Sequence, residues 1–157
     1  MTWRRAKPSD DGAIVRMCLA LNQEDPGVAP IMHDQVTKTL EAFRSEPTRG
    51  RAVVVEIDGR VVGYALLASF WSNELGGEVC VVDELYIMPA FRRRGLAKEL
   101  LESLRDGSAL WPTTAVAIGL EVSPANTAAR RLFERHGFVG TNTAMHLRRR
   151  LGVERKP

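Results

Sequence analysis

The chain has 157 residues, of which 45% are hydrophobic and 26% charged, and this composition predicts one globular domain, residues 1–157, with a buried core. It contains no run of about eighteen apolar residues and no basic-then-apolar leader after Met1, which argues against a membrane span and a secretory signal. We therefore expect a cytoplasmic protein without a membrane partner.

The net charge of +3 conceals a basic C-terminal end. Residues 1–127 hold 14 Lys and Arg against 17 Asp and Glu, whereas residues 128–157 hold 8 against 2. Such an excess can attract RNA, but it is more often a solvated helix face and tail. Because no aromatic residues alternate with these arginines to stack on bases, nucleic-acid binding is not favoured. An RNA- or ribosome-associated protein stays open as an alternative function.

The cysteines and histidines do not form a recognisable ligand set. Cys18 and Cys80 lie in apolar contexts without close spacing, which is typical of buried, reduced thiols rather than of a disulfide framework. The three histidines are scattered, and no pair has the spacing of metal ligands on one helix face. We predict no metal site.

The first half of the chain predicts a short strand, two helices and a hairpin. Pro8-Ser9-Asp10-Asp11 caps the first helix, and Asp58-Gly59 is a strong two-residue hairpin signal. In chain order, the expected elements are a strand at 2–6, a helix that ends by about residue 23, an amphipathic helix at about 33–45, and strands at 51–57 and 61–70.

The second half alternates strands and helices. After a Gly76-Gly77 turn, the expected elements are a long apolar strand at 78–88, a helix at 95–104, a buried strand at 114–122, a helix at 127–135, and a final hairpin of Phe138 with 145–149. This order predicts the α/β (α+β) class.

An arginine-rich turn joins the strand at 78–88 to the next helix. The strand breaks at Pro89, and three consecutive arginines precede Gly95, which begins the helix. Backbone N–H groups at a helix start have no intrahelical partner and lie at the positive end of the helix dipole, so they stabilise an anion. Gly95 allows close approach of the backbone, and Ala97 keeps the first turn narrow. Taken alone, the turn therefore predicts either a phosphate site or a solvated corner of an α/β domain.

Two motifs resemble the signatures of the GCN5-related N-acetyltransferases. Arg92-x-x-Gly95-x-Ala97 is similar to the family's Gln/Arg-x-x-Gly-x-Gly/Ala loop. Residues 126–138, from Asn126 to Phe138, are similar to its second signature, Asn-x-x-Ala-x-x-Leu-Tyr-x-x-x-Gly-Phe. The resemblance covers nearly the whole chain and is weakest before residue 50 and after residue 140. It implies a mixed six- to seven-stranded sheet with about four helices, whose fourth and fifth strands splay apart.

The resemblance also implies acetyl-coenzyme A as co-substrate. In this family the first signature holds the pyrophosphate, the backbone of the fourth strand contacts pantetheine, and the second signature lies near pantetheine. The residues so implied are Leu85, Tyr86, Ile87, Arg92, Arg93, Arg94, Gly95, Leu96, Ala97, Lys98, Asn126 and Ala129. Dimers are common in the family, and the C-terminal hairpin would be the contact.

Asp83 and Glu84 are the candidates for the catalytic base. An aliphatic ammonium has a pKa near ~10 and must lose a proton before it can attack a thioester. Two consecutive acids in a strand are expected to point to opposite faces of the sheet, and a buried carboxylate needs a partner. Which of the two acts stays open, and both could instead mark a solvated strand end.

Phe133 departs from the family pattern, because many relatives have a tyrosine there whose hydroxyl protonates the departing thiolate. That role cannot be carried over. A thiol with a pKa near ~8.5 can also leave as the thiolate or take its proton from water.

The acceptor side is less constrained. Glu24 and Asp25 lie in the helix–loop region that lines the acceptor pocket of this family, and they are candidates to bind a cationic amine or are simply solvated.

We therefore predict an N-acetyltransferase that acts on a primary amine (a small amine, a polyamine-like compound or a peptide amine) in a ternary complex. The main alternative is a non-catalytic acyl-coenzyme A-binding sensor or partner module.

Overall fold

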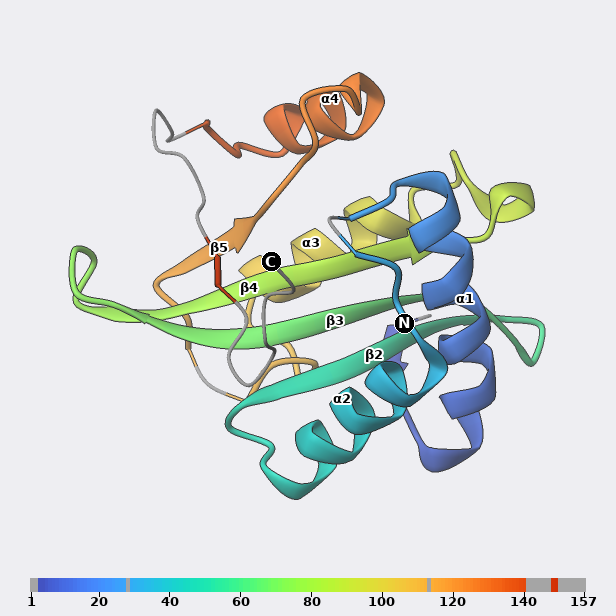
Figure 1. The fold of residues 1–157 in the computed structure, drawn as a ribbon. Helices are drawn as coiled ribbons and strands as arrows, with labels where there is room; N and C mark the ends of the chain where they lie inside the picture. The colour runs from blue at the N-terminus through green and yellow to red at the C-terminus, as the bar shows by residue number, and fades with distance from the viewer. Residues whose placement is uncertain (1–2, 28, 113, 141–147, 150–157) are drawn as a thin grey trace, which may run out of the picture. The chain divides into compact units, whose positions relative to one another are not determined.

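The computed structural model describes residues 3–27, 29–112, 114–140 and 148–149 (Figure 1). The chain divides into two compact units, residues 1–123 and 124–157. In its described residues, the first unit holds a five-stranded sheet and three α-helices, and the second holds one α-helix. No helix in these ranges is long and apolar enough to cross a lipid bilayer.

The sheet has the strand order β1-β2-β3-β4-β5. Neighbouring strands from β1 to β4 are antiparallel, and β5 runs parallel to β4. The strands are β1 (Trp3–Arg5), β2 (Gly50–Ile57), β3 (Arg60–Ser72), β4 (Gly77–Ile87) and β5 (Ala117–Leu120). The first four agree with the predicted ranges within one or two residues at each end.

The fifth strand corrects the sequence prediction. We expected a buried strand over 114–122, but β5 covers only Ala117–Leu120 and all of its residues are partly exposed. It pairs with β4 alone among the described strands, and it borders the sheet there, so one of its sides has no strand to bury it.

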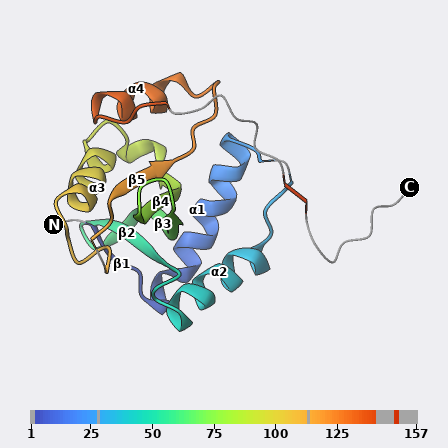
Figure 2. The same cartoon turned by 90° about the vertical axis from the view of Figure 1, so that its left-hand side faces the viewer.

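Helices cover both faces of the sheet in the first unit (Figure 2). α1 (Asp11–Glu24) and α2 (His33–Ser45) pack on one face, where Ile14, Leu40 and Tyr64 belong to one buried cluster. α3 (Leu96–Arg105) packs on the other, where Leu100 and Val82 belong to a second cluster. The β2–β3 hairpin residues alternate between the two clusters, as a sheet buried on both faces requires.

A bulge and an open edge distinguish the middle of β4. Leu67 is opposite Val82 and Leu66 is opposite Glu84, so Asp83 is an extra residue without a partner on β3. Pairing with β5 ends at Val82–Leu120, so within the described chain no strand pairs with residues 83–87 on that side. This early end to the pairing is what the predicted splay of strands four and five requires.

The second unit contains α4 (Thr127–Arg135), at the predicted position. The Phe133 and Phe138 rings meet edge to face, with their centroids 5.7 Å apart. Phe138 is not in a strand, and residues 141–147, most of the predicted partner strand, lie outside the described residues. The sheet of the described chain therefore has five strands rather than the six or seven expected.

Candidate active site

The turn between β4 and α3 and the first turn of α3, residues 92–98, have a backbone that could hold an anion, and we call this segment the cradle. A 3-10 turn, η2 (Pro89–Phe91), follows β4, and Arg93 and Gly95 then adopt left-handed φ angles of 60° and 77°. This conformation costs a residue with a Cβ, such as Arg93, about 1 kcal/mol. Gly95 is the N-cap of α3, and its carbonyl accepts from the Glu99 N–H at 2.9 Å. The N–H groups of Leu96, Ala97 and Lys98 therefore begin the helix without intrahelical acceptors.

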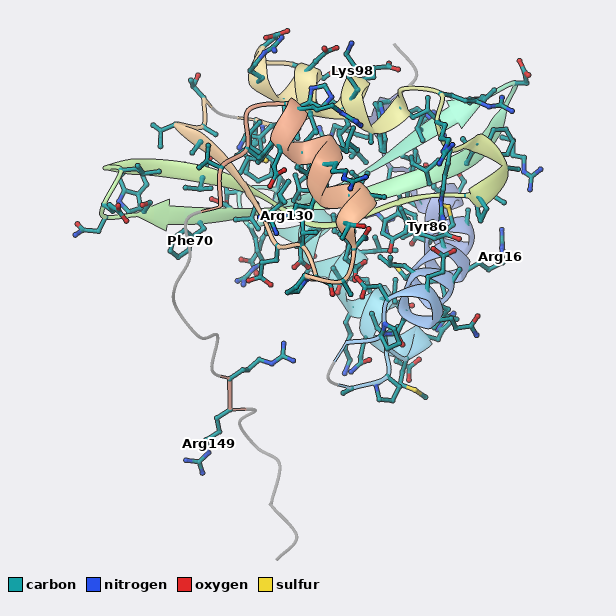
Figure 3. All side chains as sticks on the ribbon, turned by 90° about the horizontal axis from the view of Figure 1, so that it is seen from above. Arg16, Phe70, Tyr86, Lys98, Arg130 and Arg149 are labelled. Carbon is teal, nitrogen blue, oxygen red and sulfur yellow. The ribbon has the colours of Figure 1, made fainter. Side chains whose placement is uncertain are left out.

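The cationic side chains of this turn differ in their surroundings. Arg94 packs over the Phe91 ring at 5.1 Å and donates to the Ala90 carbonyl at 3.2 Å, and Arg93 is exposed. Lys98 lies on the first turn of α3 (Figure 3). Its Nζ is 3.7 Å from Glu102 Oε1. These groups surround the start of α3 with positive charge.

Arg92 points toward α1 instead. Its Nε donates to the Ile87 carbonyl at 2.8 Å, and its Nη2 lies 3.0 and 2.8 Å from the two carboxylate oxygens of Glu24. The guanidinium also stacks over the Tyr86 ring, 5.3 Å from the centroid. Arg92 and Glu24, predicted separately as a cofactor ligand and a substrate ligand, are thus partners of each other. Asp25, the C-cap of α1, is exposed.

Glu84 lies on the α1 face in a partly buried polar cluster. Its Oε2 accepts a hydrogen bond from the Tyr64 hydroxyl at 2.8 Å and a weaker one from the Cys18 thiol at 3.6 Å. Burial raises the pKa of Glu84, the Tyr64 hydrogen bond opposes this shift, and the charge of Asp83 adds to it. Burial also raises the pKa of Cys18 to about 12, so the thiol stays protonated and can donate.

Asp83 occupies the bulge and has a different environment. More than a third of its surface is exposed, yet the surrounding protein removes part of its hydration, which raises its pKa, and the negative charge of Glu121 adds to the effect. Val82 and Leu85 both pack on the α3 side, so the strict alternation that predicted opposite faces for Asp83 and Glu84 is interrupted here.

Tyr64 and Cys18 are site residues that sequence reasoning missed. Tyr64 is fully buried in β3, and Cys18 is buried in α1. Their polar atoms meet Glu84 across 20 and 66 positions of the chain. No local motif marks either residue. An aromatic residue in an apolar strand and a cysteine on the apolar face of a helix both have the sequence pattern of ordinary core residues.

The second signature forms its own local structure. The Asn126 Oδ1 accepts from the Ala129 N–H at 3.2 Å, so Asn126 is a side-chain N-cap of α4. The two residues predicted near pantetheine in this unit are therefore hydrogen-bonded to each other. Phe133 is partly buried on the same helix.

Residues 15–138 match the family model described as Acetyltransferase (GNAT) family. The chain belongs to the GNAT family. It is 24% identical over 146 residues to an uncharacterized N-acetyltransferase, YhfO of Bacillus subtilis (strain 168), and the match covers 93% of this chain and 95% of that one. The sequence resemblance is thus confirmed, and membership of the GNAT family makes the protein an acyltransferase.

Solved structures of other proteins share the GNAT fold. A possible acetyltransferase of Clostridium difficile 630 has a TM-score of 0.78 at 20% identity, covering 95% of this chain and 97% of its own. A ribosomal-protein-alanine N-acetyltransferase of Brucella melitensis biovar Abortus 2308 has a TM-score of 0.73 at 18% identity, covering 94% and 99%. At these identities the likeness supports the fold, and the expected α/β architecture is confirmed.

Proposed function

We propose that this GNAT protein transfers the acetyl group of acetyl-coenzyme A to a primary amine. The amine nitrogen attacks the thioester carbon while both substrates are bound, a C–N bond forms, and the C–S bond breaks. Glu84 accepts the first proton that the ammonium loses, directly or through a water molecule. The second N–H proton leaves the nitrogen as the amide forms and passes to the departing sulfur or to water. The acceptor is a small amine, a polyamine-like compound or a peptide amine.

The surroundings of Glu84 carry this proposal. A carboxylate with a raised pKa is a stronger base near neutral pH than an ordinary one, and perturbed acids concentrate at functional sites. Glu84 immediately precedes Leu85, Tyr86 and Ile87, where β4 has no strand partner on the β5 side within the described chain. A base is therefore next to the backbone of Leu85 and Tyr86, where a pantetheine arm would lie, whereas the Ile87 carbonyl already accepts from Arg92.

The β4–α3 turn supports the assignment of the donor. The free N–H groups at the start of α3, together with Arg93, Arg94 and Lys98, suit the pyrophosphate of acetyl-coenzyme A. Arg92 would support this loop rather than bind phosphate, because Glu24 and the Ile87 carbonyl already accept from it. Coenzyme A would leave as the thiolate or take a proton from water, since Phe133 has no hydroxyl.

The Arg92–Glu24 ion pair also narrows the choice of carboxylate that could attract the acceptor amine. Arg92 neutralises Glu24, which leaves Asp25 as the predicted acceptor-side carboxylate without that compensation. Asp25 would attract a cationic amine by a long-range field rather than by a buried contact, because it is exposed.

Calorimetric titration with coenzyme A tests the donor site. We expect the wild type to bind with micromolar or better affinity and Gly95→Asp to abolish binding. The substitution places a Cβ at a φ of 77° and an anion in the cradle. Arg149→Ala, which removes a positive charge far along the chain, is the control and should barely change the affinity. Equal losses in both variants would contradict the phosphate assignment.

Thiol release with a panel of amines tests the reaction. The panel should include simple primary amines, polyamines, and peptides with a free α-amino group. Acetyl-coenzyme A-dependent release with at least one class is the expected result. Tight coenzyme A binding without release for any class would favour the non-catalytic acyl-coenzyme A-binding module instead.

A further inference from the structure

Three side chains connect Arg92, at the start of the cradle, to Glu24, the last residue of α1. A single nitrogen of Arg92, Nη2, donates to both carboxylate oxygens of Glu24. The Tyr86 hydroxyl donates to Glu24 Oε1 at 3.3 Å, and the Arg92 guanidinium lies over the Tyr86 ring. Each member of this set thus contacts the other two. We call these three residues the latch.

The latch joins two parts of the first unit that the sequence separates widely. Glu24 is the last residue of α1, and the connection to α2 begins directly after it. Arg92 directly precedes the left-handed Arg93, and its Nε also holds the Ile87 carbonyl at the end of β4. Glu24 and Arg92 are 68 positions apart in the chain.

The geometry of the latch makes it sensitive to the backbone of the turn. A guanidinium held by a carboxylate, a backbone carbonyl and a ring face has little freedom to reorient. Tyr86 is only 6% exposed, so the surrounding core holds its ring in place. The side chains of Glu24 and Arg92 are each 42% exposed. A shift of the backbone at Arg92 must therefore move Glu24 or break its ion pair.

We propose that Arg92 and Glu24 are positioning residues that couple occupancy of the cradle to the α1–α2 connection, on the acceptor side of the site. This inference rests on the proposed function, because it takes the cradle to bind coenzyme A. Coupling of this kind is reciprocal, so the donor stabilises the acceptor-side connection and the acceptor stabilises the donor loop equally. For a half-exposed ion pair the expected effect is roughly two- to fivefold.

Amide hydrogen exchange of the full chain, with and without saturating coenzyme A, measures this coupling without an identified acceptor. In the wild type we expect coenzyme A to slow exchange at residues 93–98 and also at residues 21–27. In Glu24→Gln and Arg92→Gln, the slowing at 93–98 should persist, while the slowing at 21–27 should fall by about two- to fivefold. The double variant should lose no more than either single variant.

Arg49→Gln is the matched control. It makes the same substitution and breaks another exposed ion pair, that of Arg49 with Glu46, outside the proposed site. It should retain the wild-type response at 21–27. An Arg92→Gln response at 21–27 equal to that of the wild type would overturn the inference.

The experiment also separates two kinds of failure. Slowing at 93–98 without slowing at 21–27 in the wild type would contradict the latch and leave the donor site intact. If coenzyme A changes exchange in neither segment, the proposed donor site itself is wrong.

Discussion

Glu84 shows how a single residue acquires a chemical role from neighbours that are distant in sequence. Its carboxylate accepts from Tyr64 and Cys18, and burial is the largest influence on its pKa. Burial destabilises the charged form of Glu84 more than the Tyr64 hydrogen bond stabilises it, so the pKa of Glu84 is raised. The result is a base with a raised pKa that is still held in a defined position.

We expect Glu84→Gln to lose activity and gain stability at alkaline pH. Removing a general base lowers kcat by about 10²-fold or more, whereas the amide oxygen of the substituted side chain can still accept from the Tyr64 hydroxyl. Because the pKa of Glu84 is raised by folding, its favourable contribution to stability is present at low pH and disappears as the pH rises through the folded pKa. The Tm of Glu84→Gln should therefore exceed that of the wild type by a margin that grows as the pH rises above 4.5, the ordinary pKa of a glutamate, and through the raised pKa of folded Glu84.

Asp83→Asn is the matched control for this prediction. It makes the same carboxylate-to-amide change one position earlier, at the exposed bulge. Thiol-release rates and thermal melts of both variants decide between the two acids. A large loss of kcat in Asp83→Asn, with activity retained in Glu84→Gln, would assign the base to Asp83.

At the scale of elements, the signature motifs have structural roles beside their proposed binding roles. Asn126 caps α4, and Arg92 joins β4 to α1. The sequence predicted the bounds of α2 and α4 correctly, because capping residues and helical spacing are local signals. It did not predict the bulge at Asp83, because that feature depends on the register between β3 and β4.

Asn126 allows the capping role to be separated from a binding role. We expect Asn126→Ala to speed amide exchange in 129–135 about fivefold, because a lost side-chain cap costs about 1 kcal/mol. Asn126→Asp and Asn126→Ser should preserve the cap and the exchange rates. If coenzyme A affinity, measured by calorimetry, falls in all three variants, the amide itself contacts the cofactor; if it falls only in Asn126→Ala, the cap is what matters.

At the scale of the whole molecule, the buried cluster on the α3 side of the first unit holds the start of α3 in place. Trp3, at the start of β1, is 1% exposed and belongs to the cluster on the α3 side. Its Nε1 donates to the carbonyl of Leu96, the first residue of α3, at 2.8 Å. An edge strand therefore anchors the helix start that forms the cradle.

Trp3→Phe should destabilise the fold measurably. The variant loses a buried hydrogen bond and leaves a small cavity, which together cost about 1–3 kcal/mol of the free energy of unfolding. Urea denaturation followed by circular dichroism measures this loss. Trp71→Phe, at a residue that is 68% exposed, is the control and should change the stability by less than about 0.5 kcal/mol. Similar losses in the two variants would contradict the anchoring role of Trp3.

The sequence alone determined the order of the described elements, the arginine-rich turn between β4 and α3 and the family, because these depend on spacing, caps and turn residues that act over a few positions. Only the tertiary structure decided that Tyr64 and Cys18 surround Glu84 and that Arg92 pairs with Glu24 rather than pointing into its own loop. Those contacts join side chains between 20 and 68 positions apart, and no local signal specifies them. They arise because packing α1 on a bulged β4 brings these side chains within hydrogen-bonding distance.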